Sequence, residues 1–149
     1  MLRGISSLLT PDLLAAMWRM GHGDTIVLCD AHFPAAALAR GREHRLDAAS
    51  MVPLTAAILE LLALDTYDSP PVTLMAPEAG DSIDEAFREQ LIETIIPWSP
   101  TGSDIRMLSR PDFYREAAEA QVVVATGETA TYANVLLRKG VTPTGAARV

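Results

Sequence analysis

Two titratable side chains, His22 and Asp30, lie eight positions apart on either side of a short apolar run. Gly21 and Gly23 flank the histidine, and glycine removes the Cβ constraints on the backbone that presents it. Asp30 directly follows the apolar run, where a strand would open into a loop. An imidazole and a carboxylate on loops both reach solvent, and histidine titrates near neutral pH. The pair therefore predicts proton-transfer chemistry.

The elements that must position this pair are readable from the surrounding sequence. Thr10 followed by Pro11 is typical of an N-cap and a first helical residue, and Gly21 is typical of a helix end. Residues 25–29 are apolar without alternation, as in a parallel strand that is covered on both faces. We therefore expect a short helix to lead to the histidine and a buried strand to lead to the aspartate.

The rest of the chain alternates helix and strand patterns. Helices are predicted from Ser50 and Pro53 to about residue 64, after a capping box of Ser82 and Glu85, and over residues 111–120. Strands are predicted at residues 72–75, 105–108, 122–125 and 135–137, and residues 41–44 are predicted to be an exposed connection. This alternation predicts an α/β fold with a mostly parallel central sheet.

Polar residues follow the predicted strands. Asp30, Arg110 and a Gly-Glu pair at 127–128 each come after a strand, and ligands of open parallel sheets bind beyond the carboxyl ends of the strands. The link before the last strand is shorter than the roughly dozen residues that a parallel crossover needs, so this strand should run antiparallel and start at the same edge. Tyr132 and Asn134 then join the group. A carboxylate, a guanidinium, a phenol and an amide suit a small polyol or sugar.

His22 does not join this group so simply within one chain. It precedes the predicted strand that Asp30 follows, and eight extended residues at about 3.3 Å each span roughly 26 Å. Either the glycine-flanked segment folds back sharply, or His22 serves the cleft of a neighbouring subunit. We favour the second, because residues 54–64 are apolar around nearly the whole helix and would leave one face for a partner.

Composition narrows the classes of protein further. The chain has 149 residues, of which 49% are hydrophobic, which suits one core and predicts a single domain over 1–149. A formal net charge of −7 argues against nucleic acid as a partner, because phosphate would be repelled. No signal peptide or membrane-spanning run is evident, and one cysteine fits a reducing compartment, so we expect a cytoplasmic protein. We interpret Cys29 as a small buried hydrophobe.

Several longer motifs carry a family resemblance when they are taken together. They are Gly21-His22-Gly23-Asp24, Asp30-Ala31-His32-Phe33-Pro34, Phe113-Tyr114 after Arg110, and Thr126-Gly127-Glu128 through Tyr132-Ala133-Asn134 to Lys139-Gly140-Val141. Over nearly its whole length the chain resembles the fucose mutarotase and D-ribose pyranase family, whose members interconvert cyclic forms of free sugars. The motif at 30–34 resembles the fucose branch, whereas Ala133 matches the ribose branch.

The resemblance implies a fold, an assembly and a set of site residues. The fold would be a three-layer α/β sandwich without cofactor, and the assembly a cyclic homo-oligomer, often a decamer, with sites at subunit interfaces. His22 would be the proton donor. The sugar contacts would come from Asp30, Arg110, Tyr132, Ala133 and Asn134. The proton acceptor stays open between Asp30, a water that it holds, and His22 acting in both steps.

Other interpretations of the same residues are also open. A noncatalytic sugar-binding or regulatory module would keep the pocket without proton transfer. Asp30 could be the N-cap of a following helix, and Arg110 could pair with Asp112 or Glu116 on the surface. The histidines together with Asp30 invite a metal site, but no two histidines have a helical i, i+4 spacing, so no metal is expected.

Overall fold

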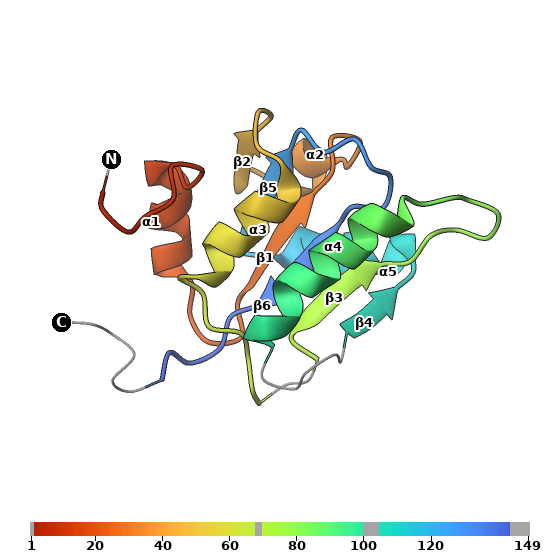
Figure 1. Cartoon of the computed structure of the whole chain (residues 1–149). Helices are drawn as coiled ribbons and strands as arrows, with labels where there is room; N and C mark the ends of the chain where they lie inside the picture. Colours follow the sequence, from red (N-terminus) through yellow and green to blue (C-terminus); the bar gives the residue numbers. More distant parts are fainter. Residues whose placement is uncertain (1, 68–69, 100–104, 144–149) are drawn as a thin grey trace.

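The computed structural model describes residues 2–67, 70–99 and 105–143 of the chain. Its strands are β1 (Thr25–Cys29), β2 (Glu43–Leu46), β3 (Val72–Met75), β4 (Ile105–Leu108), β5 (Val122–Thr126) and β6 (Val135–Arg138). They form one six-stranded sheet with the order β2-β5-β1-β6-β3-β4 (Figure 1). The strands predicted at 25–29, 72–75 and 105–108 are confirmed with the same bounds. Those predicted at 122–125 and 135–137 are each one residue longer.

One strand of this sheet runs against the others. β6 pairs antiparallel with β1 on one side and with β3 on the other, whereas β5 is parallel to both β1 and β2 and β4 is parallel to β3. The predicted antiparallel last strand is therefore confirmed. It lies in the middle of the sheet, separated from β5 by β1. As a result, β6 starts at the edge where the parallel strands end.

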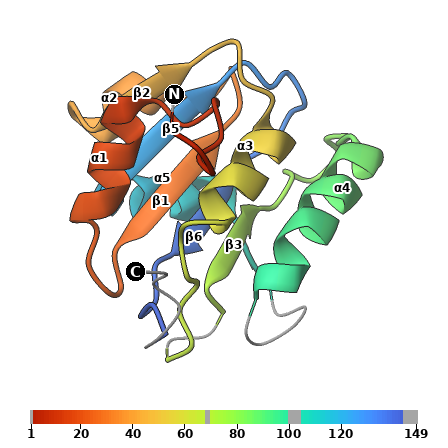
Figure 2. The same cartoon turned by 60° about the vertical axis from the view of Figure 1, so that its left-hand side comes forward.

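Helices cover both faces of the sheet, which gives three layers (Figures 1 and 2). α1 (Pro11–Arg19), α3 (Met51–Leu59) and α4 (Glu85–Ile95) lie on one face, and α2 (Ala35–Ala39) and α5 (Arg110–Glu119) lie on the other. A short 3-10 turn, η1 (Ile96–Trp98), follows α4. The expected α/β sandwich with a mostly parallel sheet is confirmed. Among the described helices, none combines the length and the apolar character needed to cross a membrane.

Each face of the sheet has its own apolar core. On one face, Ile26 and Leu28 of β1 pack among the buried side chains of α1, α3 and α4. On the other face, Val27 and Cys29 pack against a cluster that includes Phe113 of α5. Successive residues of a strand point to opposite faces, and here both faces are covered. This double burial explains why β1 is apolar without alternation.

Of two predicted helix N-termini, one is confirmed and the other is wrong. Thr10 is the N-cap of α1, and its hydroxyl oxygen accepts a hydrogen bond from a first-turn amide at 3.3 Å. The predicted capping box of Ser82 and Glu85 is wrong. Asp84 is the N-cap of α4, and its carboxylate accepts a hydrogen bond from Phe87 N at 3.0 Å. The reason is that an aspartate, itself a strong capping residue, stands immediately before the first helical turn.

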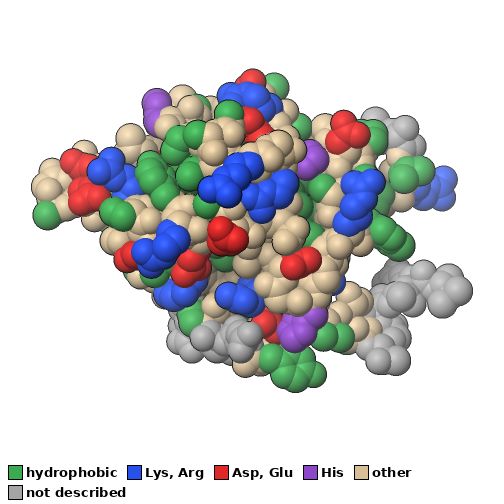
Figure 3. All heavy atoms as spheres, turned by 180° about the vertical axis from the view of Figure 1, so that it is seen from behind, with side chains coloured by type: hydrophobic (Ala, Val, Ile, Leu, Met, Phe, Trp, Pro, Cys, Tyr) green, Lys and Arg blue, Asp and Glu red, His purple; other side chains and the backbone are tan. Residues whose placement is uncertain are grey.

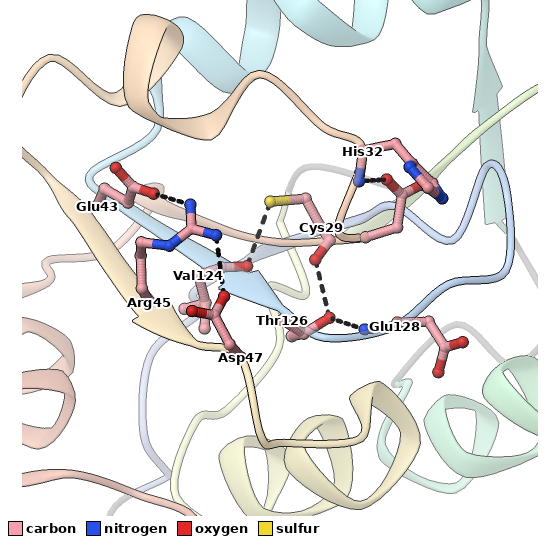
Figure 4. Close-up of polar contacts among 9 residues, drawn as sticks. Cys29, His32, Glu43, Arg45, Asp47, Val124, Thr126 and Glu128 are labelled. Carbon is pink, nitrogen blue, oxygen red and sulfur yellow. Dashed lines mark hydrogen bonds and ion pairs between the residues drawn. The ribbon is translucent and has the colours of Figure 1, made fainter.

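The sequence patterns do not predict α2 and β2. Residues 41–44 are expected to be an exposed connection, yet Glu43 and His44 belong to β2 at the edge of the sheet. Arg45 on this strand pairs with Glu43 and with Asp47, as Figure 4 shows. Charged side chains on an edge strand deter pairing with other chains. The same charges remove the apolar signal by which the inner strands are recognised.

The apolar side chains around α3 pack against other elements of the same chain. The helix ends at Leu59 rather than at residue 64, and it packs on both β1 and α4. Met51, Leu54 and Ile58 of this helix are fully buried. A neighbouring helix of the same chain therefore covers the face that was expected to leave room for a partner subunit. Of the predicted apolar segment 54–64, Leu61, beyond the end of α3, is the large apolar side chain that stays exposed, at 45%.

Gly127, directly after β5, lies where two loops of this fold are in close contact. A Cβ atom at this position would lie 1.9 Å from the carbonyl oxygen of Asp47, in the loop after β2. Gly127→Ala must push the two backbones apart, and overpacking of this kind costs about 1–3 kcal/mol of unfolding free energy. Chemical denaturation measures this loss.

Gly21→Ala is the matched control for that variant. Its Cβ would meet Asp24 Oδ2 at 3.7 Å, an ordinary contact, and the backbone there is not left-handed. We expect its unfolding free energy to stay within about 0.5 kcal/mol of the wild type. Equal losses in the two variants would contradict the close approach at Gly127.

Candidate functional site at the carboxyl edge of the sheet

A cavity of about 280 Å³ lies at the edge where β1 and β3 end and β6 begins. Its lining comprises Asp30, His32, Phe33, Met75, Asp81, Arg110, Tyr114, Thr131, Tyr132 and Asn134. The expectation that Asp30, Arg110, Tyr132 and Asn134 meet at one edge is therefore confirmed as geometry. They converge because β6 is inverted, so that its first residues stand beside the ends of its parallel neighbours.

Asp30 and Asn134 form a buried pair at the base of the cavity. Asn134 Nδ2 donates to Asp30 Oδ2 at 2.8 Å, and the backbone N of Asp30 donates to Asn134 Oδ1 at 3.2 Å. The other carboxylate oxygen accepts from His32 N at 2.9 Å. The two residues are only 4% and 3% exposed, so these bonds replace most of the water that a free carboxylate would hold. The pair fixes a carboxylate that faces the cavity.

The environment of Asp30 disfavours its charge. Burial raises the pKa of Asp30 above its ordinary value of 3.8, and the hydrogen bonds from His32 N and from Asn134 partly offset that rise. A carboxylate in such surroundings gains from any further donor. Hydroxyl groups of a bound ligand are donors of this kind.

A second polar group forms the outer rim of the cavity. Tyr132 has a left-handed backbone, with φ at 60°, and its hydroxyl donates to Asp81 and accepts from Glu78 N at 3.3 Å. The hydrogen bond to Asp81 raises the pKa of the Tyr132 phenol. Arg110 Nε lies 3.3 Å from Glu78 Oε1, and both side chains are about half exposed. Asp81 and Glu78 lie in the loop between β3 and α4, and no sequence pattern marks them as site residues.

The remaining wall of the cavity is apolar. Phe33 packs edge-on against Tyr114, with ring centroids 5.2 Å apart, and against Phe113 at 6.1 Å. Met75 completes this wall, and the exposed residue His32 also lines the cavity. The site thus combines one apolar wall with a carboxylate, an amide, a phenol and a guanidinium.

Two residues expected at this edge do not line the cavity. Ala133 is buried among the core side chains on the α3 and α4 face, beside Tyr132 and Asn134 in sequence. The Glu128 carboxylate turns back on its own loop and accepts from Thr129 N at 2.9 Å. Glu128 N donates to the Thr126 hydroxyl, which in turn donates to Cys29 O, as Figure 4 shows.

The two structural alternatives for the cleft residues are wrong. The N-cap position of α2 belongs to Pro34, not to Asp30. Arg110 pairs with Glu78, whereas Asp112 pairs with Arg115 at 2.8 Å and Glu116 pairs with Arg106. Both Asp30 and Arg110 therefore present polar atoms at the cavity.

Cys29 is buried as expected, one residue before Asp30. Its Sγ donates to Val124 O at 3.3 Å (Figure 4), and burial raises the pKa of the thiol to about 12. A thiol that stays protonated is neither a nucleophile nor a metal ligand. Cys29 is therefore a packing residue of the sheet.

His22 lies at the opposite edge of the sheet from the cavity. It precedes β1, and its loop is tied to the far end of β6 because Gly23 N donates to Lys139 O at 2.9 Å. The loop closes through Gly21 N, which donates to Asp24 Oδ2 at 2.7 Å. Gly23 supplies a left-handed turn, with φ at 85°. The alternative in which this segment folds back toward Asp30 is therefore wrong.

At its own edge His22 has two partners that no sequence pattern predicts. Its Nε2 lies 3.0 Å from Oδ1 of Asp65, a fully buried carboxylate. Its ring packs at 5.3 Å from the ring of Tyr67, while 45% of the His22 side chain stays exposed. The available signal for Asp65 was a single acid that ends the apolar run 61–64.

Metal ligation finds no support in the described part of the chain. No group of three or more His, Cys, Asp or Glu side chains there could hold an ion. Figure 3, which shows the face opposite to that in Figure 1, has histidine side chains at separate places and basic side chains mixed with acidic ones.

Comparisons with known proteins agree with this architecture. Residues 3–142 match the model of the RbsD / FucU transport protein family. The chain is 41% identical over 143 residues to the L-fucose mutarotase of Histophilus somni (strain 2336), covering 96% of this chain and 99% of that protein.

Two solved structures share the fold. The fucose mutarotase of Streptococcus pneumoniae in complex with L-fucose has a TM-score of 0.88 and 37% identity, covering 95% of this chain and 100% of that one. RbsD of Bacillus subtilis complexed with D-ribose has a TM-score of 0.72 and 23% identity, covering 96% and 100%. The second likeness supports the fold alone. The fucose branch is therefore nearer in sequence than this ribose-binding structure.

Asn134→Ala tests the buried pair at the base of the cavity. The variant removes a donor from the Asp30 carboxylate, so the pKa of Asp30 rises further and unfolding free energy falls by about 1–3 kcal/mol at neutral pH. Above this raised pKa, Asp30 is charged in both states and the full loss is present. Below the ordinary value of 3.8 it is neutral in both states, so the loss attributable to its charge disappears as the pH falls.

Urea unfolding in neutral and in acidic buffer measures this pH dependence. Gln121→Ala, the truncation of an exposed amide, is the control and should change stability little in either buffer. An Asn134→Ala loss that is the same in both buffers would show that the bond to the carboxylate is not its cause.

Proposed function

Because the chain belongs to the RbsD/FucU family, we propose that it is a sugar mutarotase, an isomerase that interconverts the anomers of a free monosaccharide such as L-fucose. The observation that carries the proposal is the buried Asp30–Asn134 pair under a cavity of about 280 Å³. This volume is just below the usual range for drug-sized ligands, about 300–1,000 Å³, and so suits a single sugar ring. L-Fucose is favoured over D-ribose because a relative with 41% identity is an L-fucose mutarotase.

The cavity supports this assignment through the groups it offers. Asp30 accepts hydrogen bonds from sugar hydroxyls, Arg110 donates to sugar oxygens, and Asn134 and Tyr132 fix further hydroxyls. The backbone around Ala133 aligns the last two. The aromatic wall of Phe33 and Tyr114 packs against the apolar C–H face of the ring. Each group thus has a defined role in holding a polyhydroxylated ring of this size.

Anomer exchange needs one proton donor and one proton acceptor. The imidazolium of His22 donates a proton to the ring oxygen while the bond from that oxygen to the anomeric carbon breaks. The proton of the anomeric hydroxyl passes to an acceptor, which is Asp30, a water held by it, or His22 in a later step. The free aldehyde rotates and closes on its other face, and the reverse transfers restore both groups. The cycle balances without a cofactor.

The position of His22 supports a site shared between subunits. Within one chain His22 and Asp30 lie at opposite ends of β1, farther apart than one sugar can bridge. Tyr67, whose ring packs against His22, is 73% exposed. Trp18, which is 91% exposed, and Leu61 line an apolar groove of about 530 Å³. Such an exposed apolar surface is typical of an interface. We infer a cyclic homo-oligomer, such as a decamer, in which His22 of one subunit faces the cavity of the next.

The second candidate function is a noncatalytic sugar-binding module. Like the mutarotase, it would be a single cytoplasmic domain. The separation of His22 from the cavity favours it if the chain acts as a monomer, since the cavity alone binds but lacks the proton donor. Acceleration of anomer exchange discriminates between the two functions.

Saturation-transfer NMR on L-fucose tests the catalytic role of His22. We expect wild-type protein to raise the exchange rate between the α and β anomers above that in buffer. His22→Ala should remove about 10²–10⁴-fold, the usual share of a positioned acid–base group, without changing oligomer size. His44→Ala, a histidine on β2, should keep the wild-type rate. Wild-type exchange in His22→Ala would remove this residue from the mechanism.

The pH dependence of sugar affinity tests Asp30. Sugar hydroxyls donate to its charged form, and the pKa of Asp30 is raised, so affinity should begin to fall at a higher pH than for an ordinary aspartate. Asp30→Asn should bind L-fucose at least about tenfold more weakly and lose this pH dependence, because the charge-assisted bonds are worth about 1.5–3 kcal/mol. Isothermal titration calorimetry at several pH values, with L-fucose and with D-ribose, measures the affinity and its pH dependence. Equal affinity in wild type and variant would exclude Asp30 from the sugar contacts.

A further inference from the structure

Asp65 and His22 form a contact that the proposed mechanism does not yet use. His22 Nε2 lies 3.0 Å from Asp65 Oδ1, within hydrogen-bond range, and the carboxylate side chain is fully buried while the imidazole is 45% exposed. Among the described residues, the other ring nitrogen of His22, Nδ1, has no hydrogen-bond partner. The ring is therefore anchored through one nitrogen and free at the other.

The backbone around Asp65 holds its carboxylate in a fixed place. Asp65 N donates to Arg138 O at 3.1 Å, and Gly140 N donates to Ala63 O at 2.7 Å. A Cβ at Gly140 would lie 2.4 Å from Leu64 O, so only glycine permits this approach. Asp65 Oδ1 also accepts from Tyr67 N at 3.0 Å. The backbone around Asp65 is thus tied to the end of β6. The same end of β6 also holds the loop of His22.

The chemistry of an imidazole beside a carboxylate fixes which nitrogen carries the proton. A carboxylate is an acceptor, so Nε2 must be the protonated nitrogen of the neutral ring. We propose that Asp65 is a positioning residue that holds His22 in the Nε2–H tautomer, so that Nδ1 is the nitrogen that exchanges a proton with the sugar. This inference rests on the proposed mutarotase function and assigns a task to a residue outside the sugar cavity.

The assignment completes the proton path. Protonated His22 carries hydrogen on both nitrogens, with Nε2–H bound to Asp65 and Nδ1–H directed away from it. Nδ1–H passes its proton to the ring oxygen as the ring opens, which leaves the neutral Nε2–H tautomer. On closure, Nδ1 takes a proton back from the same oxygen. The Asp65 carboxylate holds the ring throughout and stabilises its cationic form.

Tyr67 limits the remaining freedom of the ring. Its side chain packs at 5.3 Å from the imidazole with the two planes tilted by 59°, and it is itself 73% exposed. Together with the hydrogen bond to Asp65, this contact restricts rotation of the His22 ring.

The test is the tautomer of His22 together with the kinetics of Asp65→Asn. In wild-type protein labelled with ¹⁵N-histidine, the neutral His22 ring should show protonated Nε2 and bare Nδ1. In Asp65→Asn the amide can donate to Nε2, so the Nδ1–H form should appear. The kcat for anomer exchange of L-fucose should fall more than about tenfold, in the direction of the roughly 10⁴-fold loss for the equivalent change in serine proteases. KM should stay within about twofold.

Glu60→Gln, which removes an exposed acid near the end of α3, is the control and should change neither tautomer nor kcat. A wild-type ring with protonated Nδ1 would overturn the assignment even if Asp65→Asn does not fold. Wild-type kcat in a folded Asp65→Asn would overturn it as well. Absence of exchange activity in the wild type would instead reject the proposed function, while the ring spectrum would still report on the Asp65 contact.

Discussion

The hydrogen bonds between Asp30 and Asn134 hold the cavity together, and they exist because β6 is inverted within a parallel sheet. Asp30 ends β1, and Asn134 immediately precedes β6, which pairs with β1. A parallel β6 would have put its first residues at the other edge. Two hydrogen bonds between residues 104 positions apart in sequence, one of them from the backbone N of Asp30, thus join the middle of the sheet to the cavity. Burial makes each bond costly to leave unmade, which fixes the geometry of the cavity floor.

The same sheet separates the two groups of residues to which the proposed function assigns roles. The proposed binding groups gather at the carboxyl edge, and the His22–Asp65 pair lies at the other edge, with the length of β1 between them. A strand that is buried on both faces cannot shorten or bend to bring these edges together. The arrangement therefore favours action between subunits over action within one. Exposed apolar side chains near His22, rather than the surface of α3, now carry the argument for an assembly.

The sequence predicts the inner strands of this molecule well and the charged edge strand β2 poorly. Strands covered on both faces are continuous apolar runs, so β1 and β3 were predicted with correct bounds, and the polar groups at their ends followed from topology. Edge strand β2 carries charges, and its pattern resembles a loop. Asp81 and Asp65 could not be found, because their contacts join segments far apart in sequence. Only the folded chain reveals which acid meets which partner.

The buried thiol of Cys29 has a practical consequence. It is the chain's single cysteine, has no exposed surface, and has a pKa of about 12. Alkylating reagents attack the thiolate, so they reach this sulfur only when β1 separates from its neighbours. The rate of labelling in native buffer therefore reports how often the centre of the sheet opens. Cys29 thus serves as an internal probe of local opening, one residue away from the floor of the cavity.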